Sequence, residues 1–241
     1  NGRRLMSLKN GTKAIQYGYD ESGLRTRKYT GTYTVFDRDA SGNLVHETRN
    51  NGTNHLYYYY DANGSIGSIS YNGVRYAFRK NLQGDVIAIL DTNGNVVAKY
   101  TYDAWGKILS ITDANGNAVT SSTHIANINP IRYRGYYYDT ETGWYYLNSR
   151  YYDPQVKRFI NADEIIDNRD IKTQNLFSYC ANNPVNRIDV GGMFWKELWE
   201  GAKNVVSGVI HAGNNIAVAI GIDTAAIGAF FLNMSKDDSG V

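Results

Sequence analysis

The chain has 241 residues, of which 42% are hydrophobic and 20% are charged, and its formal net charge is +2. A chain of this size can bury a sizeable core, and its near-neutral charge, without a long run of Lys or Arg, argues against nucleic acid as the main partner. The single cysteine, Cys180, excludes an internal disulfide, which fits a cytosolic protein or a secreted one without disulfides.

The first 125 residues alternate between strand-like runs and turn signals. The whole chain contains 21 Tyr, 24 Gly and only 3 Pro. Tyr, with Thr, Val and Ile, favours strands that are apolar on one face and solvated on the other, and Gly favours tight turns. Strands are predicted at residues 44–48, 86–90 and 96–102.

One phrase returns along this region: an aromatic residue, Asp, two variable positions and Gly. It stands at residues 19–23, 60–64 and 102–106, with weaker copies at 39–42, 81–84, 91–94 and 113–116. Internal repetition of this kind indicates a repetitive architecture. We expect each Asp to cap its turn by accepting backbone N–H bonds, so the Asp and Tyr residues of the phrase are interpreted as scaffold and not as catalytic groups.

Asn-Gly dipeptides mark further turns in the same region, at residues 10–11, 51–52, 72–73, 93–94 and 115–116. Asn-Gly is a strong hairpin signal because both residues tolerate a positive φ. A single hairpin cannot bury a face by itself. The repeats are therefore expected to stack side by side into a long twisted sheet over residues 1–128.

The composition changes at about residue 129. Four motifs follow in order: NPIRYRGYYYD (129–139), GWYYLNSRYYDP (143–154), KRFI (157–160) and NNPVN (182–186). Through these motifs, residues 129–193 resemble the Rhs-repeat-associated core domain, and the region before them resembles Rhs/YD repeats.

The resemblance implies a mainly β fold, in which stacked β-hairpin YD repeats form part of a large curling sheet or shell. The core domain plugs this shell, and a short helical segment follows at residues 194–241. Proteins of this family are polymorphic toxins whose shell encapsulates a toxic C-terminus. The implied partners are the chain's own C-terminal toxin as cargo, an immunity protein and a secretion machinery, and the implied location is secreted or at the bacterial cell surface.

The resemblance also implies self-cleavage, since in many members the core is an aspartic-protease-like element that cuts its own chain. Carried over to matching positions, the catalytic residues are Arg150, Asp163 and Asp189, and the cleavage site is the bond between Met193 and Phe194. The family's Asp-Pro-x-Gly motif is incomplete here. The first acid is followed by Glu-Ile-Ile, without Pro or Gly, and the second by Val-Gly-Gly, without Pro.

A second change in composition follows Met193. Residues 194–203 are predicted to form an amphipathic helix, and residues 205–232 are rich in Ala, Ile, Val and Gly. Polar residues interrupt the second stretch, so buried or amphipathic helices are favoured over a transmembrane span, and membrane association of residues 205–232 stays an alternative. We interpret the chain as a section of a longer protein whose toxic enzyme lies beyond residue 241.

Other classes of site receive little support. The four His residues lack ligand-like spacing, and no Cys-x-x-Cys or His-Glu-x-x-His motif occurs, so neither a metal nor a cofactor is predicted. Cys180 is expected to be a packed small residue. The alternative function is a non-catalytic structural or carbohydrate-binding module of the cell surface, in which exposed Tyr and Trp of the repeats stack on sugars.

Overall fold

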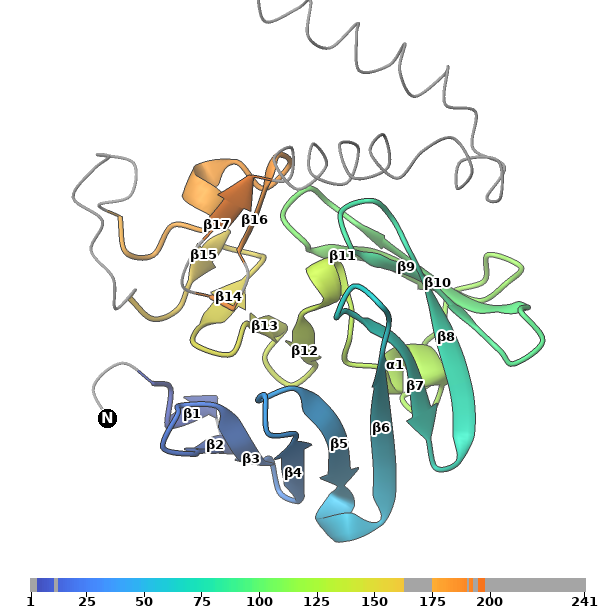
Figure 1. Cartoon of the computed structure of the whole chain (residues 1–241), viewed down its shortest axis with the longest axis horizontal. Coiled ribbons are helices and arrows are strands. Elements are labelled where there is room, and N and C mark those ends of the chain that lie inside the picture. Colours follow the sequence, from blue (N-terminus) through green and yellow to red (C-terminus); the bar gives the residue numbers. More distant parts are fainter. Residues whose placement is uncertain (1–3, 11–12, 163–174, 190, 193–194, 198–241) are drawn as a thin grey trace, which may run out of the picture. The chain divides into compact units, whose positions relative to one another are not determined.

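A computed structural model describes residues 4–10, 13–162, 175–189, 191–192 and 195–197 (Figure 1). The described residues up to position 196 belong to one compact unit. Eleven of the described strands belong to one sheet: β1 (Ser7–Asn10), β2 (Lys13–Tyr19), β3 (Arg25–Tyr29), β4 (Tyr33–Arg38), β5 (Leu44–Arg49), β6 (Asn54–Tyr60), β7 (Ile66–Tyr71), β8 (Val74–Lys80), β9 (Val86–Leu90), β10 (Val96–Tyr102) and β11 (Ile108–Thr112).

The remaining described elements are short. A four-stranded sheet contains β12 (Tyr137–Asp139), β13 (Trp144–Tyr146), β14 (Tyr151–Asp153) and β15 (Arg158–Phe159), and a two-stranded sheet contains β16 (Arg187–Asp189) and β17 (Trp195–Glu197). The helical segments are α1 (Ile125–Ile128) and the 3-10 turns η1 (Asn50–Gly52), η2 (Tyr133–Gly135) and η4 (Cys180–Asn182).

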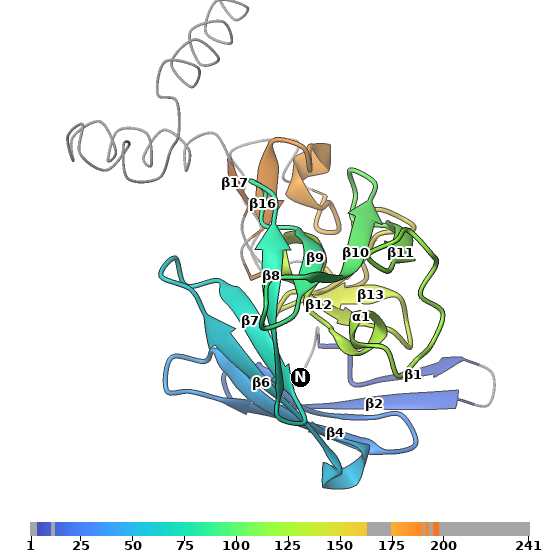
Figure 2. The same ribbon diagram turned by 90° about the vertical axis from the view of Figure 1, so that its right-hand side faces the viewer.

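The large sheet is an antiparallel meander in which strand order follows chain order from β1 to β11. This confirms the mainly β fold and the side-by-side stacking of hairpins. The predicted strands coincide with β5, β9 and β10. The strand direction turns markedly along the sheet, as β2 and β8 show in Figure 2, and this twist is the normal consequence of L-residue sterics.

The Asp-x-x-Gly phrase forms the turns, and its Asp acts as expected. At residues 39–43, Asp39 Oδ1 accepts from the backbone N–H groups of Ser41 and Asn43, each at 2.9 Å. The N–H of Gly42 donates to the carbonyl of Asp39 at 3.0 Å, and φ of Gly42 is 83°. The turns at residues 61–65, 91–95, 103–107 and 113–117 repeat this pattern. The carboxylates are therefore turn caps.

The Tyr that precedes Asp in the phrase ties one repeat to the previous one. A register shift at the end of the strand marks this residue in β2, β6 and β10. The hydroxyl of Tyr60 then donates to the carbonyl of Leu44 at 3.0 Å, and that of Tyr102 to the carbonyl of Val86 at 2.8 Å. Each bond reaches back sixteen residues. The phrase thus encodes both a turn and an inter-repeat link.

The Asn-Gly dipeptides fall into two classes, which their sequence does not distinguish. At residues 51–52 and 72–73 both φ angles are positive, as predicted for a tight hairpin. At residues 93–94 and 115–116 only the Gly has a positive φ. There Asn does not adopt the positive φ that it tolerates, because these dipeptides occupy the last positions of an Asp-x-x-Gly turn whose Asp sets the backbone.

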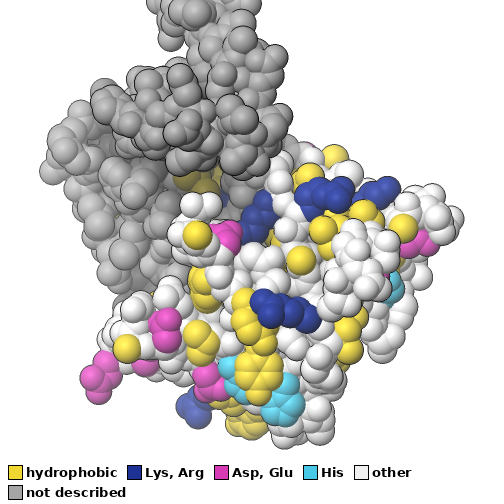
Figure 3. All heavy atoms as spheres, turned by 45° about the vertical axis from the view of Figure 1, so that its right-hand side comes forward, with side chains coloured by type: hydrophobic (Ala, Val, Ile, Leu, Met, Phe, Trp, Pro, Cys, Tyr) yellow, Lys and Arg dark blue, Asp and Glu magenta, His cyan; other side chains and the backbone are white. Residues whose placement is uncertain are grey.

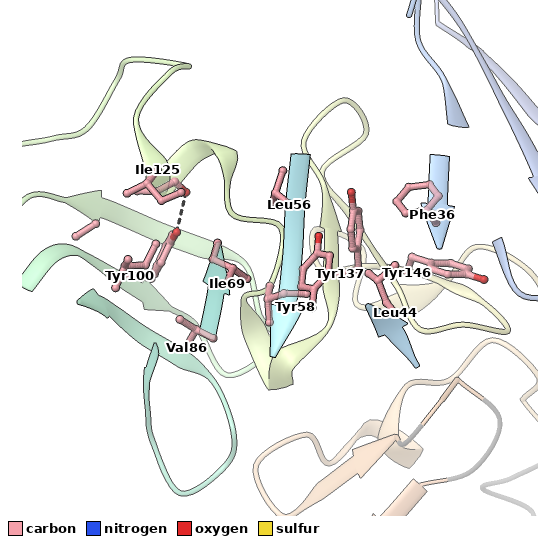
Figure 4. Packing of buried hydrophobic residues seen from close by; sticks show 14 of the residues in the cluster. Phe36, Leu44, Leu56, Tyr58, Ile69, Val86, Tyr100, Ile125, Tyr137 and Tyr146 are labelled. Atoms are coloured by element: carbon pink, nitrogen blue, oxygen red, sulfur yellow. Dashed lines mark hydrogen bonds between the residues drawn. The ribbon is translucent and has the colours of Figure 1, made fainter. Parts of the chain in front are cut away.

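The core lies between one face of the large sheet and the segment from α1 to β15. Figure 4 shows Tyr137 and Tyr146 of the small sheet packed among Phe36, Leu44 and Tyr58 of the large sheet. A buried cation lies at the same interface. Arg25 is 1% exposed, its Nη1 is 2.5 Å from Asp139 Oδ2, and aromatic rings surround its guanidinium.

The structure corrects the amphipathic helix predicted for residues 194–203 at the three of its residues that are described. Residues Trp195–Glu197 form strand β17, which pairs with β16. Pairing with an available strand edge overrides the local helical pattern. The other residues of the predicted helix lie outside the described residues, as does the apolar stretch 205–232. In the part of the chain that is described, no helix is long and apolar enough to cross a membrane.

Candidate functional site

Arg150 lies in the loop between β13 and β14, and its side chain is buried. The loop is closed by a bond from the N–H of Leu147 to the carbonyl of Arg150 at 2.9 Å. The guanidinium carbon is 3.6 Å from the centroid of the Phe159 ring on β15, a cation–π contact. Loop and ring together fix the direction in which the guanidinium points.

The guanidinium of Arg150 binds three groups from the end of the core segment. Its Nη2 donates to Asp189 Oδ2 at 3.2 Å, its Nη1 donates to the carbonyl of Leu176 at 3.1 Å, and its Nε donates to the carbonyl of Gly192. One side chain thereby holds both an acid and the backbone three residues after that acid. Such charge-assisted bonds orient their partners more strongly than neutral ones do.

Asp189 ends strand β16 and is 2% exposed. The hydroxyl of Tyr136 donates to the backbone carbonyl of Asp189 at 2.8 Å. Burial raises the pKa of Tyr136 well above its ordinary value, so the phenol keeps its proton and remains a donor. Burial, with the negative charge of Asp189 adding to it, also raises the pKa of Cys180 to about 12, so the nearby thiol stays neutral. No sequence motif had linked Tyr136 to this acid.

Two glycines follow Asp189 closely and pack against the loop that carries Arg150. The hydroxyl of Ser149 donates to the carbonyl of Gly191 at 2.8 Å. Gly192 has φ of 76°, and a Cβ there would lie 2.7 Å from Ser149 Oγ and 2.8 Å from the carbonyl oxygen of Leu147. The site therefore requires glycine at this position for both conformation and space.

Among the residues expected at the site, the structure brings Arg150 and Asp189 together. Asp163, Met193 and Phe194 lie outside the described residues. One described stretch of the chain ends at Ala162, and within it Asn161 Oδ1 accepts from the N–H of Tyr151 at 3.1 Å. Tyr151 is the first residue of β14 and follows Arg150 directly, so the chain two residues before Asp163 is bonded next to the residue that carries the guanidinium.

A second polar cluster lies on the large sheet and was missed by sequence reasoning. Strands β5 and β6 place His46 Nε2 3.2 Å from His55 Nδ1, and Asp37 Oδ2 on β4 is 2.8 Å from His46 Nδ1. The two rings are nearly parallel, at 7°, with centroids 5.4 Å apart, the geometry of an in-plane hydrogen bond. No group of three His, Cys, Asp or Glu suited to a metal ion occurs within the described ranges.

Comparison with known proteins gives both sequence and structural relatives. A family model described as the teneurin YD-shell matches residues 2–185. Similar proteins include the tRNA3(Ser)-specific nuclease WapA of Bacillus spizizenii, 38% identical over 179 residues, and the double-stranded DNA deaminase toxin A of Burkholderia cenocepacia, 37% identical over 105 residues. These matches cover 73% and 44% of this chain but only 7% of either relative. The chain thus spans a small fraction of their length.

Among solved structures, a chain of the TcdB2–TccC3–Cdc42 crystal structure matches with a TM-score of 0.59 and 21% identity, over 77% of this chain and 9% of that chain. A chain of the TcdB2–TccC3 crystal structure gives the same TM-score and identity, over 77% of this chain and 10% of that chain. At this identity the likeness concerns the fold, and it agrees with the sheet in Figure 1.

Proposed function

Because the chain belongs to the teneurin YD-shell family and is an Rhs/YD-repeat scaffold related to polymorphic toxins, we propose that it houses a C-terminal toxin and cuts its own backbone between Met193 and Phe194. The scaffold part rests on the repeats and on the core segment packed against them. The cleavage part rests on one observation: Arg150 holds Asp189 and the carbonyl of Gly192 at the same time.

The proposed reaction is amide hydrolysis by two carboxylates, Asp163 and Asp189. Two carboxylates held close together cannot both ionise and therefore share one proton. One then takes a proton from the attacking water while the other donates to the amide. Arg150 orients Asp189 and stabilises negative charge that develops on the carbonyl oxygen. Its bond to Gly192 fixes the backbone one residue before the proposed scissile bond.

The relatives support the scaffold role over an enzymatic role of the repeats. The names of two relatives describe different activities, a tRNA nuclease and a double-stranded DNA deaminase toxin, yet both match this chain at similar identity. A region shared by proteins of different activity is best explained as their common container. We therefore place the toxin beyond residue 241, as the cargo of the shell.

The same proposal includes the cellular location and the partners of the protein. A cargo toxin requires a route out of the cell, so the chain is assigned to a secreted or cell-surface bacterial protein that meets a secretion machinery and an immunity protein. On the face shown in Figure 3, basic, acidic and hydrophobic side chains are interspersed. This mixture gives no support to a nucleic-acid partner for the scaffold itself.

The carbohydrate-binding alternative requires aromatic rings with a free face. Tyr57 and Tyr59 on β6 are exposed. However, the ring of Tyr57 stacks on His46 with centroids 4.3 Å apart, and Arg75 lies 4.2 Å from the centroid of Tyr59. Each of these rings packs on a neighbour in the sheet, and this packing accounts for the position of the two tyrosines without a sugar ligand.

The proposed cut is tested by comparing the purified 241-residue chain with its Asp163→Asn and Asp189→Asn variants during incubation. Each variant removes one carboxylate with little change in shape, and both are expected to remain whole while the wild type is cut. Asp153→Asn is the matched control, because Asp153 lies on the same small sheet and binds the Trp144 indole instead of Arg150. Equal cleavage of the wild type and both acid variants would rule out the carboxylate mechanism.

A further inference from the structure

The fourth turn of the repeats, residues 81–85, differs from the others in the position of its acidic residue. Asn81 takes the position that Asp holds in most copies, and it still caps the turn, since its Oδ1 accepts from the N–H groups of Gln83 and Asp85. Its Nδ2 donates to Asp85 Oδ2 at 2.7 Å, a bond that an Asp at position 81 could not make. The carboxylate of this turn therefore stands at its last position and not at its first, and this residue, Asp85, is buried.

The displaced carboxylate of Asp85 binds the core segment. Its Oδ1 accepts from the N–H of Arg134 at 2.9 Å. Arg134 lies in η2 with φ of 54°, an uncommon conformation for a residue with a side chain. The bond from Asp85 helps to hold it, and the Arg134 side chain is directed across the turn as a result.

Arg134 and Gln83 both bind backbone carbonyl groups just before β16. Arg134 Nη2 donates to the carbonyl of Pro184 at 2.5 Å, and its Nη1 donates to the carbonyl of Gln83 at 3.1 Å. Gln83 Nε2 donates to the carbonyl of Val185 at 2.8 Å. Two successive carbonyls close to the start of β16 are thus bound: that of Val185 by Gln83 of the repeat turn, and that of Pro184 by Arg134 of the core segment, which is itself bonded to the turn. The turn that follows β8 is therefore in contact with the residues that precede β16.

From this chain of contacts we propose that Gln83 and Arg134 are positioning residues for self-cleavage, a role that rests on the proposed function. They act through the backbone of residues 184–185, which they hold against the repeat turn. This fixes β16 and with it the distance between Asp189 and Arg150. A repeat turn thereby takes part in building the site, and the cut depends on the core being seated on its own shell.

The test uses Gln83, which is only half-buried, so that folding is preserved. Gln83→Glu keeps the shape of the side chain but removes its donor, and Gln83→Ala removes both. Losing one hydrogen bond of this kind is expected to slow cleavage of the full chain about three- to tenfold. Leu82→Ala is the matched control in the same turn, because the Leu82 side chain is fully exposed, and it should cut at the wild-type rate.

The pH dependence separates positioning from a loss of fold. If Asp189 is held less closely by Arg150, its carboxyl is protonated more easily. The acidic limb of the rate profile should therefore move to higher pH in both Gln83 variants and stay in place in Leu82→Ala. Wild-type rates and an unmoved limb in both Gln83 variants would overturn the positioning role while leaving the cut itself intact. A wild type that never cuts would overturn the proposed function, and the positioning role with it.

Discussion

At the scale of single residues, the main surprise is buried charge between the large sheet and the core segment. Asp139 is fully buried and binds Arg25 Nη1 and Lys28 Nζ, the latter at 2.7 Å. Strand alternation cannot predict this arrangement, because Arg25 and Lys28 read as ordinary solvent-facing residues of a polar strand. The partner lies more than a hundred residues away, so only the tertiary structure identifies the pair.

Replacing Asp139 with Asn should destabilise the fold strongly, because Arg25 would remain buried without its counter-charge and Lys28 would keep only Glu141, 3.0 Å from its Nζ. Breaking one side of such a pair costs about 3–5 kcal/mol, measurable by urea denaturation. Asp61→Asn is the control: Asp61 is more exposed, lies 3.6 Å from Lys80 and keeps its capping oxygen as Asn, so the loss should stay below about 1 kcal/mol. Equal losses in the two variants would refute the role of the buried pair.

The same pair gives a pH dependence with a definite sign. Burial acts to raise the pKa of Asp139, but Arg25 and Lys28 outweigh it and hold the pKa below its ordinary value. A carboxyl with a depressed folded pKa contributes its stability above the unfolded pKa, about 3.9, and loses it as the pH falls through the folded pKa. The stability gap between wild type and Asp139→Asn should therefore narrow below about pH 4. A gap that stayed constant there would contradict this assignment.

At the scale of elements, the turns were the most predictable part of the fold. Asp-x-x-Gly specifies its own geometry through bonds within five residues, so its capping role could be predicted from local sequence. Strand β17 could not, because its pairing with β16 decides its structure. The family resemblance led us to expect Asp189 and Arg150 in one site. The contacts of Tyr136, Gln83 and Arg134 could not be expected in this way, because they arise from packing between distant turns.

Two glycines with the same turn conformation should respond differently to substitution. Gly64 and Gly106 have φ of 74° and 86°. A Cβ at Gly64 meets nothing within 4 Å, so Gly64→Ala should cost only the conformational strain of about 1–2 kcal/mol. A Cβ at Gly106 would lie 2.5 Å from the Tyr133 ring, so Gly106→Ala should cost clearly more. Thermal unfolding of the two variants compares them, and similar melting temperatures would show that Tyr133 does not pack on this turn.

The link between repeats can be tested on one hydroxyl. Tyr102→Phe removes the bond to the Val86 carbonyl and leaves the ring in place. The expected loss is about 0.5–1.5 kcal/mol in the free energy of unfolding. Tyr59→Phe, on the exposed outer face, serves as the comparison and should be close to neutral. An equal effect of both substitutions would mean that the hydroxyl of the repeated Tyr does not join neighbouring repeats.

At the scale of the whole molecule, the repeats and the core segment form one structural unit. The large sheet binds the core through Arg25, through the buried tyrosines and through the turn at residues 81–85. Sequence repetition predicted the meander, since each phrase specifies the next hairpin. It could not predict which turn would hold the core, because the exchange of Asp and Asn at residues 81 and 85 does not by itself show that Asp85 binds Arg134.

The most direct test of the central claim is the intact mass of the purified wild-type chain, followed over time. The chain is expected to convert into two fragments that join between Met193 and Phe194, beside the backbone that Arg150 holds at Gly192. The position of the junction matters as much as the cut itself, because the cleaved bond must lie next to the backbone that Arg150 binds at Gly192. A single full-length mass after prolonged incubation, or a junction far from residue 193, would contradict the account and leave the chain as a scaffold alone.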